Sequence, residues 1–257
     1  MGFRGGGQAR HGAWRAGERA AGRRVVSCGI AGDVADASAR EAPLVSPAAR
    51  LDPAWLKLIA ITDSLRDGIP GLAARAAAAV RGGATMLQLR LTDESARTLV
   101  EVARALRVAA PEVPLIVNCR ADVALASGAQ GVHVGVDDLS PNALRRIVPA
   151  DFIIGASVGT ELEIGRAVGA DYVGIGPVYS TGSALEFGVA IGPAGFSSLA
   201  ARCRVPAVAI GGITVENAPD VMAAGASGVA VISAVFGADD PMPRARALRS
   251  VLDASGK

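Results

Sequence analysis

Short apolar runs alternate with longer amphipathic segments along most of this 257-residue chain. Eight of the runs are rich in β-branched residues and end at glycine, proline or a polar residue, which predicts strands. These strands cover residues 56–62, 85–90, 115–118, 131–134, 153–157, 172–175, 207–210 and 228–232. Between them lie segments with apolar residues at helical spacing, clearest at 69–81, 95–109, 215–224 and 241–254.

The repeated strand–helix alternation predicts an α/β protein built as a single (β/α)₈ TIM barrel of parallel strands. Glycines stand where helices should end, and the pair Gly-Ala recurs at residues 83–84, 128–129, 169–170 and 225–226. A doubly wound sheet is the alternative, although eight strands are more than one such sheet usually holds. We expect the barrel domain to cover residues 54–257.

Residues 1–53 differ from the rest of the chain, because they are rich in Gly, Arg and Ala, contain no Lys and show no strand pattern. This composition predicts a low-complexity, disordered tail. Extra codons translated from an upstream start and an Arg-rich transit peptide are the alternatives. The presence of Glu18, Asp33, Asp36 and Glu41 disfavours the transit peptide, and the lack of an apolar core after the first arginines disfavours a secretion signal.

The composition excludes several classes of protein. The net charge of +2 gives no electrostatic case for binding nucleic acid, and no apolar run is long enough to cross a bilayer. The three cysteines, Cys28, Cys119 and Cys203, are widely spaced and odd in number, which argues against a disulfide framework. A reducing, cytoplasmic location is therefore predicted, and assembly into a homo-oligomer stays open.

The active site of such a barrel lies at the carboxyl ends of its strands, which selects the residues that follow each run. The most informative segment is 208–214, which reads Val-Ala-Ile-Gly-Gly-Ile-Thr. Gly211 and Gly212 would let a ligand approach the backbone. We expect Thr214 to cap the next helix and to direct its free N–H groups at a phosphate.

Hydroxyl groups follow the sixth and eighth strands as well. Thr181 and Ser183 lie in the loop after the sixth, and Ile232 and Ser233 follow the eighth. Loops after strands seven and eight of barrels often bind phosphate, so a phosphorylated ligand is predicted here.

Polar side chains also follow strands two, three and five. Gln88 and Arg90 alternate along one strand and so share a face, where they suit an anionic or heteroaromatic ligand. Asn118 suits a ligand oxygen or ring nitrogen, and Ser157 suits a phosphate or a leaving group. The structural alternatives are a polar plug of the barrel for Gln88 and Arg90 and simple turn chemistry for Asn118.

Three further residues have competing interpretations. Asp138 would lie at the barrel mouth and suits Mg²⁺, yet the stretch also predicts a helix start with Ser140 as N-cap and Pro141 in the first turn. His133 is expected to be a hydrogen-bonded structural histidine. Cys119 has no visible base-and-orienter pair, which disfavours thiol catalysis.

Several motifs occur in a fixed order between about residues 56 and 252. They are Gln-x-Arg, the Asn that ends the third strand, Gly-Val-His-x-Gly-x-x-Asp, Gly-x-Ser-Val, Gly-Ala-Asp-Tyr-Val-Gly-x-Gly-Pro-Val-Tyr, Ala-Ile-Gly-Gly-Ile-Thr and Gly-Val-Ala-Val-Ile-Ser. This order resembles the thiamine phosphate synthase family and its TenI-type thiazole tautomerase relatives. The synthases join hydroxymethylpyrimidine diphosphate to a thiazole phosphate carboxylate, with Mg²⁺, and release pyrophosphate. A pyrimidine carbocation is thought to form and to be captured by the thiazole nitrogen.

The resemblance implies a role for each matching residue. Gln88, Arg90, Asn118 and Ser157 would contact the pyrimidine diphosphate, with Arg90 and Ser157 as the catalytic residues; Asp138 would bind Mg²⁺; Thr181, Ser183, Gly212, Ile232 and Ser233 would hold the thiazole phosphate. The small phosphorylated substrates are thus the expected partners.

The chain departs from the family pattern at positions that usually carry charge. Thr92, Cys119 and Ala184 stand where the synthases usually have Lys, Asp and Lys, and Gly159 stands where the tautomerases have His. Lys57 or Arg120 is a candidate to replace a lost cation. A tautomerase and a non-catalytic protein that binds thiazole or thiamine phosphate are therefore kept as alternatives to a synthase.

Overall fold

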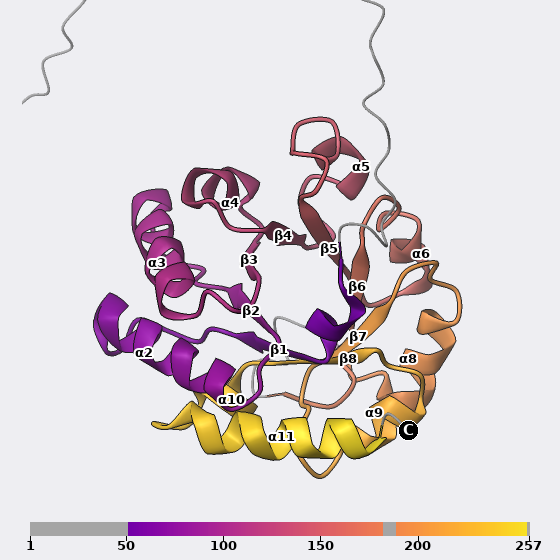
Figure 1. The fold of residues 1–257 in the computed structure, drawn as a ribbon. Helices are drawn as coiled ribbons and strands as arrows, with labels where there is room; N and C mark the ends of the chain where they lie inside the picture. The colour runs from indigo at the N-terminus through magenta and orange to yellow at the C-terminus, as the bar shows by residue number, and fades with distance from the viewer. Residues whose placement is uncertain (1–50, 182–188, 256–257) are drawn as a thin grey trace, which may run out of the picture. The chain divides into compact units, whose positions relative to one another are not determined.

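Eight parallel strands close into a barrel in the computed structural model, which describes residues 51–181 and 189–255 (Figure 1). The strands are β1 (Leu58–Ile61), β2 (Met86–Leu89), β3 (Leu115–Asn118), β4 (Gly131–Val134), β5 (Ile153–Val158), β6 (Tyr172–Ile175), β7 (Ala207–Ile210) and β8 (Gly228–Val231). Each pairs with its sequence neighbours, and β8 pairs with β1. This closure confirms the predicted TIM barrel and excludes a doubly wound sheet, whose edge strands would be unpaired.

Helices follow the strands and surround the barrel. They are η1 (Pro53–Leu56), α2 (Gly68–Arg81), α3 (Ala96–Ala109), α4 (Ala121–Ser127), α5 (Pro141–Leu144), α6 (Glu161–Ile164), α8 (Gly192–Ala200), α9 (Ala218–Ala223), α10 (Ser233–Phe236) and α11 (Pro241–Ser255). Figure 1 shows α11 between α2 and α9 in the ring of helices, and it packs on both of them. No helix of the described ranges is long and apolar enough to cross a membrane.

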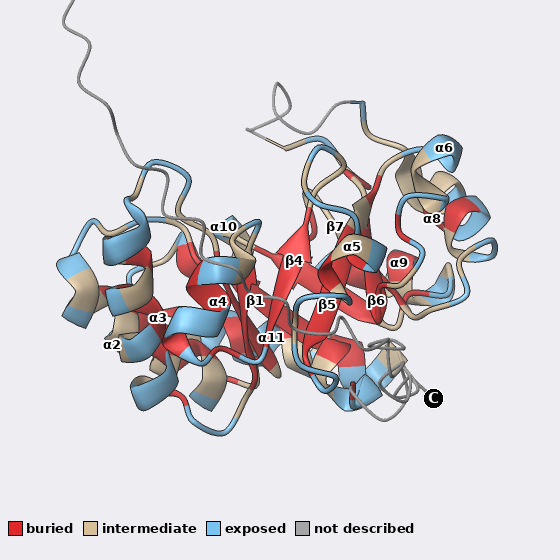
Figure 2. Cartoon of the chain, turned by 90° about the horizontal axis from the view of Figure 1, so that it is seen from above, coloured by how far each residue is buried: buried red, intermediate tan, exposed pale blue. Residues whose placement is uncertain are grey.

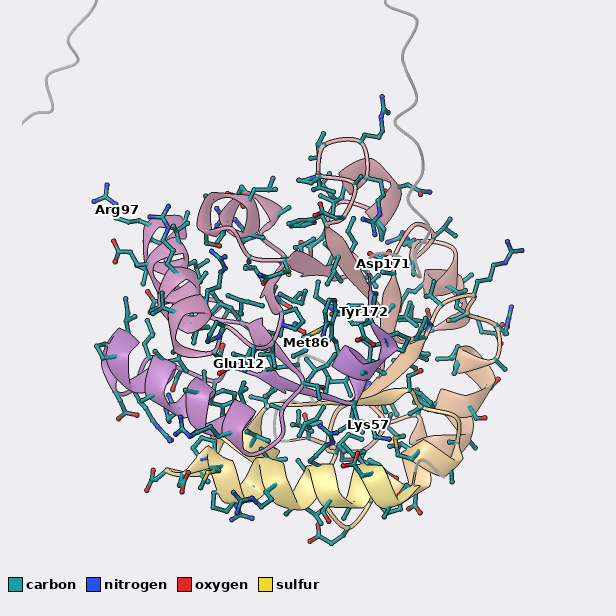
Figure 3. The ribbon with its side chains drawn as sticks, viewed as in Figure 1. Lys57, Met86, Arg97, Glu112, Asp171 and Tyr172 are labelled. Carbon is teal, nitrogen blue, oxygen red and sulfur yellow. The ribbon has the colours of Figure 1, made fainter. Side chains whose placement is uncertain are left out.

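The apolar residues form two cores, one on each side of the sheet. The larger core lies between the barrel and its helices, and Figure 2 shows the buried strands inside the exposed outer helix faces. The smaller core fills the barrel, where Met86 and Tyr172 meet (Figure 3). Leu51 and Leu56, which precede β1, belong to this interior cluster. The carboxyl end of the barrel carries polar residues alongside apolar ones such as Ile210 and Ile232.

The strand register brings these polar residues together. Asn118 on β3 pairs with His133 on β4, and His133 pairs with Gly155 on β5. Side chains along a strand alternate between the barrel interior and the helices, so Gln88, Asn118, His133 and Ser157 all face inward. Residues 1–50 of the predicted tail (residues 1–53) lie outside the described ranges, so the tail stays a prediction.

One predicted cap is wrong. Thr214 does not start the helix after β7, because α9 begins at Ala218 with Asn217 at its N-cap position. The Asn217 side chain closes the intervening turn: its Oδ1 accepts from the Thr214 N–H at 2.8 Å, and its Nδ2 donates to the Gly212 carbonyl at 2.9 Å. The Thr214 N–H is therefore used within the loop and is not directed at a ligand.

Candidate active site

A cavity of about 1030 Å³ opens at the carboxyl ends of β4 to β8. Six of the residues predicted from the sequence line it: Asp138, Ser157, Thr181, Gly212, Ile232 and Ser233. Ser183 lies outside the described residues, as does Ala184. The remaining three, Gln88, Arg90 and Asn118, stand at the neighbouring ends of β2 and β3 rather than in the cavity lining. The cavity thus lies at the carboxyl ends of the strands, where the strand-end rule predicts the active site.

The loop after β7 requires glycine at residue 212. Gly212 has φ of +65°, and a Cβ there would lie 2.7 Å from the carbonyl oxygen of Ser180 and 2.9 Å from that of Tyr179. The loops after β6 and β7 therefore pack backbone against backbone. The exposed Ser233 hydroxyl at the end of β8 faces the same cavity.

Ser157 belongs to a chain of three side chains. The Nε2 atom of His133 lies 3.1 Å from Ser157 Oγ, and the Nδ1 atom lies 3.1 Å from Tyr172 Oη. Burial lowers the pKa of His133 to about 4, against a smaller opposing effect of the Asp138 charge, so the ring is neutral at pH 7. Both ring nitrogens have partners, which confirms His133 as a hydrogen-bonded structural histidine.

A second chain crosses the ends of β2 and β3. Gln88 is buried, and its Nε2 donates to Asn118 Oδ1 over 2.9 Å. The Asn118 Nδ2 in turn lies 2.9 Å from Cys119 Sγ. Asn118 therefore connects two strand ends, which is more than the turn chemistry considered as its alternative.

Cys119 stands between these two series of hydrogen-bonded side chains. Its backbone is left-handed, with φ of +61°. The residue is exposed as a whole, yet burial of the sulfur, a hydrogen bond to Asp138 and the Asp138 charge raise the pKa of the thiol to about 12, while Arg90 acts in the opposite direction. The thiol stays protonated at neutral pH, which makes it a poor nucleophile. The same interactions bring Arg90, Cys119 and Asp138 into one electrostatic group.

Asp138 is the carboxylate best placed for a cation. Its Oδ2 accepts from the Gly135 N–H at 2.8 Å, which fixes the side chain at the cavity wall, and exposed Asp137 lines the cavity beside it. No group of three or more metal-ligating residues occurs in the described ranges. Mg²⁺ is commonly held by one or two carboxylates plus phosphate oxygens, so this donor set fits an ion that arrives with a phosphorylated substrate. Ser140 and Pro141 start α5 as predicted, so the helix start and the carboxylate site coexist.

Neither candidate replacement cation serves the site. Lys57 precedes β1 and therefore lies at the amino end of the barrel, opposite the cavity. Arg120 is paired with Asp122 at 2.6 Å, beside its own helix α4. Lys57 was a wrong choice because a residue that precedes a parallel strand lies at the amino end of the barrel. Arg120 was a wrong choice because Asp122 holds its guanidinium beside α4.

Two residues of the site escaped the sequence analysis. Tyr172 faces the barrel interior from β6, and the period-two alternation of side chains along this strand could have predicted that position. Glu163 lines the cavity, and its Oε2 accepts from the N–H groups of Gly159 at 2.5 Å and Thr160 at 3.2 Å. The Thr-x-x-Glu spacing of a capping box was the readable signal for it.

Comparison with known proteins agrees with this geometry. A family model described as thiamine monophosphate synthase matches residues 58–235, which is more than half of the chain. The chain belongs to the thiamine monophosphate synthase family.

Curated members of this family resemble the chain over most of its length. The thiamine-phosphate synthase of Azorhizobium caulinodans is 45% identical over 204 residues, covering 78% of this chain and 96% of the relative. That of Methanoculleus marisnigri is 48% identical over 186 residues, covering 71% and 87%. Among solved structures, thiamine phosphate pyrophosphorylase from Pyrococcus furiosus has a TM-score of 0.70 at 36% identity, covering 79% and 98%. The family match, residues 58–235, spans all eight strands and the residues that line the cavity.

Proposed function

We propose that this chain is a transferase of thiamine biosynthesis, a thiamine phosphate synthase that joins hydroxymethylpyrimidine diphosphate to a thiazole phosphate and releases pyrophosphate. The observation that carries the proposal is a single cavity of about 1030 Å³ lined both by Asp138 and Ser157 and by Gly212 and Ser233. Pockets for one small ligand usually span about 300–1,000 Å³, so this one has room for two substrates side by side.

The two sides of the cavity suit the two substrates. Arg90 brings a positive charge at the neighbouring ends of β2 and β3, outside the cavity lining, and on the β4–β5 side of the cavity Ser157 brings a hydroxyl group and Asp138 a carboxylate. We assign the diphosphate to this side, with Gln88 and Asn118 facing the pyrimidine. On the side of β6 to β8, we assign the phosphate of the thiazole to Thr181, Gly212, Ile232 and Ser233, which line the cavity there.

The chemistry asks the protein to stabilise a leaving pyrophosphate and to align the acceptor nitrogen. Ser157 donates to a diphosphate oxygen, and Arg90 offsets the negative charge that develops as the carbon–oxygen bond breaks. The loop after β7 that contains Gly212 (the phosphate loop) holds the thiazole. The thiazole nitrogen then faces the carbon that pyrophosphate leaves. Apolar Ile210 and Ile213 also line the cavity, which limits the access of water to it.

Asp138 is proposed to hold Mg²⁺, with phosphate oxygens of the substrate completing its coordination. When bound, the ion supplies charge neutralisation to the diphosphate. Asp137 is the nearest further carboxylate in the cavity lining. The protonated Cys119 thiol adds no negative charge, so we expect cation binding to depend on the diphosphate.

The tautomerase alternative receives no support from the site, because Gly159 offers no side chain where that chemistry uses a histidine. We further propose a cytoplasmic location, which is consistent with free Cys119 and Cys203. The substrates are small phosphorylated molecules.

The deciding experiment follows thiamine phosphate formation by chromatography after the full chain is incubated with both substrates and Mg²⁺. We expect product, and we expect omission of Mg²⁺ or the change Ser157→Ala to reduce its rate. Absence of product, together with retained binding of the thiazole phosphate, would overturn the proposal in favour of a non-catalytic binding protein.

A further inference from the structure

Tyr172, His133 and Ser157 form a line of hydrogen bonds from the barrel interior to the cavity. They come from adjacent strands β6, β4 and β5, and both bonds measure 3.1 Å. Tyr172 is 1% exposed and His133 is 8% exposed, whereas Ser157 is half-buried and lines the cavity. The line therefore has one buried end and one end that a ligand can reach.

The barrel makes room for this line with two glycines. A Cβ on Gly155 would lie 2.5 Å from His133 Nδ1 and 2.5 Å from Tyr172 Oη, which is closer than side chains approach. A Cβ on Gly174 would lie 3.2 Å from His133 Cε1. Strands β5 and β6 thus lack side chains at the positions that the imidazole and phenol rings occupy, so any larger residue at Gly155 would displace these rings.

The buried end sets the direction of the hydrogen bonds. Among the described residues, His133 Nδ1 is the one partner of the Tyr172 hydroxyl. A buried hydroxyl proton without an acceptor is unfavourable, so Tyr172 donates to Nδ1. A neutral imidazole carries one proton, which must then reside on Nε2.

The accessible end follows from this tautomer. The Nε2–H of His133 donates to Ser157 Oγ, so the serine has no acceptor on the histidine for its own proton. We propose that Tyr172 and His133 are positioning residues that turn the Ser157 hydroxyl proton into the cavity, where it donates to an anionic oxygen of the substrate. This inference rests on the proposed function, because it takes that oxygen to belong to the diphosphate.

The opposite tautomer would have the opposite effect. With the proton on Nδ1, Ser157 would donate to Nε2 and present only lone pairs to the cavity. Lone pairs repel an anionic oxygen, whereas a hydroxyl proton attracts it. The buried Tyr172 hydroxyl would thereby control whether Ser157 donates a hydrogen bond to a phosphate oxygen.

The tautomer is measured directly by NMR of the full chain labelled with ¹⁵N-histidine. The chain has two histidines, His11 and His133, and His133→Gln assigns their signals. We expect a protonated Nε2 and an unprotonated Nδ1 in His133, and a mixture of tautomers in Tyr172→Phe. A protonated Nδ1 in the unmodified chain would overturn the inference. This measurement needs no activity, so its result is independent of the proposed reaction.

A double-mutant cycle tests the path through Ser157. Tyr172→Phe is expected to lower kcat/KM for the pyrimidine diphosphate about tenfold, the size of one hydrogen bond to a charged group, and to leave KM for the thiazole phosphate unchanged. In the Ser157→Ala background the same change should have no further effect. An undiminished tenfold loss in that background would show that Tyr172 acts by another route and would overturn the inference.

Discussion

Gln88 Nε2 donates a hydrogen bond to Asn118 Oδ1 across 2.9 Å, joining the carboxyl ends of β2 and β3. Gln88 is only 4% exposed, so its amide depends on this partner. Asn118 uses its other amide atom towards Cys119. The two residues predicted to face the pyrimidine therefore also hold each other in place, and site geometry and local stability are coupled.

The change Asn118→Leu should destabilise the barrel because it leaves the Gln88 amide without its bond. The expected loss is about 1–3 kcal/mol, the cost of an unsatisfied buried polar group. The double change Gln88→Met/Asn118→Leu removes both amides and should recover most of that loss. Urea unfolding of the three proteins measures the difference, and equal stability of the single and double variants would contradict the coupling.

The fold could be predicted from the sequence because each strand is a short apolar run that ends at glycine, proline or a polar residue. Strands β3, β4, β6 and β7 have the predicted bounds, since glycine, proline and polar residues delimit them on both sides. The start of α9 was misjudged because Thr214 and Asn217 are both good capping residues. The choice between them depends on the carbonyl of Gly212, whose position is set by the folded loop.

The sequence predicted the positions of the site residues but not the hydrogen bonds and electrostatic interactions between them. The strand-end rule selected Ser157 and Asp138 from local sequence. The bond between His133 and Tyr172 depends on the register of β4, β5 and β6, which brings together residues 39 positions apart. The raised pKa of Cys119 likewise depends first on burial of the thiol and then on Asp138, which approaches it from the next strand end. Contacts of this kind are fixed by tertiary packing, beyond the range of spacing rules.

The change Cys119→Asp should strengthen the binding of Mg²⁺. A carboxylate at this position would stand beside Asp138 and supply a second hard ligand, and aspartate tolerates the left-handed backbone better than most residues. We expect the Mg²⁺ concentration for half-maximal rate to fall about tenfold, since ligand charge sets the affinity of such sites. Cys119→Asn, of matching shape but uncharged, is the control. Equal responses of the two variants would argue against a cation at Asp138.

Gly212→Ala should impair binding of the thiazole phosphate. The added Cβ would meet the backbone of Tyr179 and Ser180, so the phosphate loop must move. Backbone strain of this kind costs about 1–3 kcal/mol, and a comparable loss in binding raises KM about tenfold or more. Gly225→Ala is a matched control, because Gly225 also has a positive φ, +96°, but has no neighbour within 4 Å. The result that contradicts this placement is a normal KM in Gly212→Ala.

Stability should fall in mild acid because of His133. Its pKa is lowered from the ordinary 6.5 to about 4 in the folded protein, since burial favours the neutral ring. Between these two values the unfolded chain binds more protons at this residue than the folded one, so the free energy of unfolding decreases as the pH falls. Above pH 6.5 the histidine is neutral in both states and its contribution is fully present.

The expected contribution is about 2 kcal/mol lost between pH 7 and pH 5, from the linkage relation for a group shifted by this amount. Carboxylates also titrate in acid, so the comparison is made with His133→Gln, which keeps a polar side chain but has no proton to gain. Urea unfolding of both proteins at pH 7 and pH 5 gives the difference between their slopes. Parallel pH dependence in the two proteins would mean that the pKa of His133 is not lowered in the folded barrel, which would contradict this prediction.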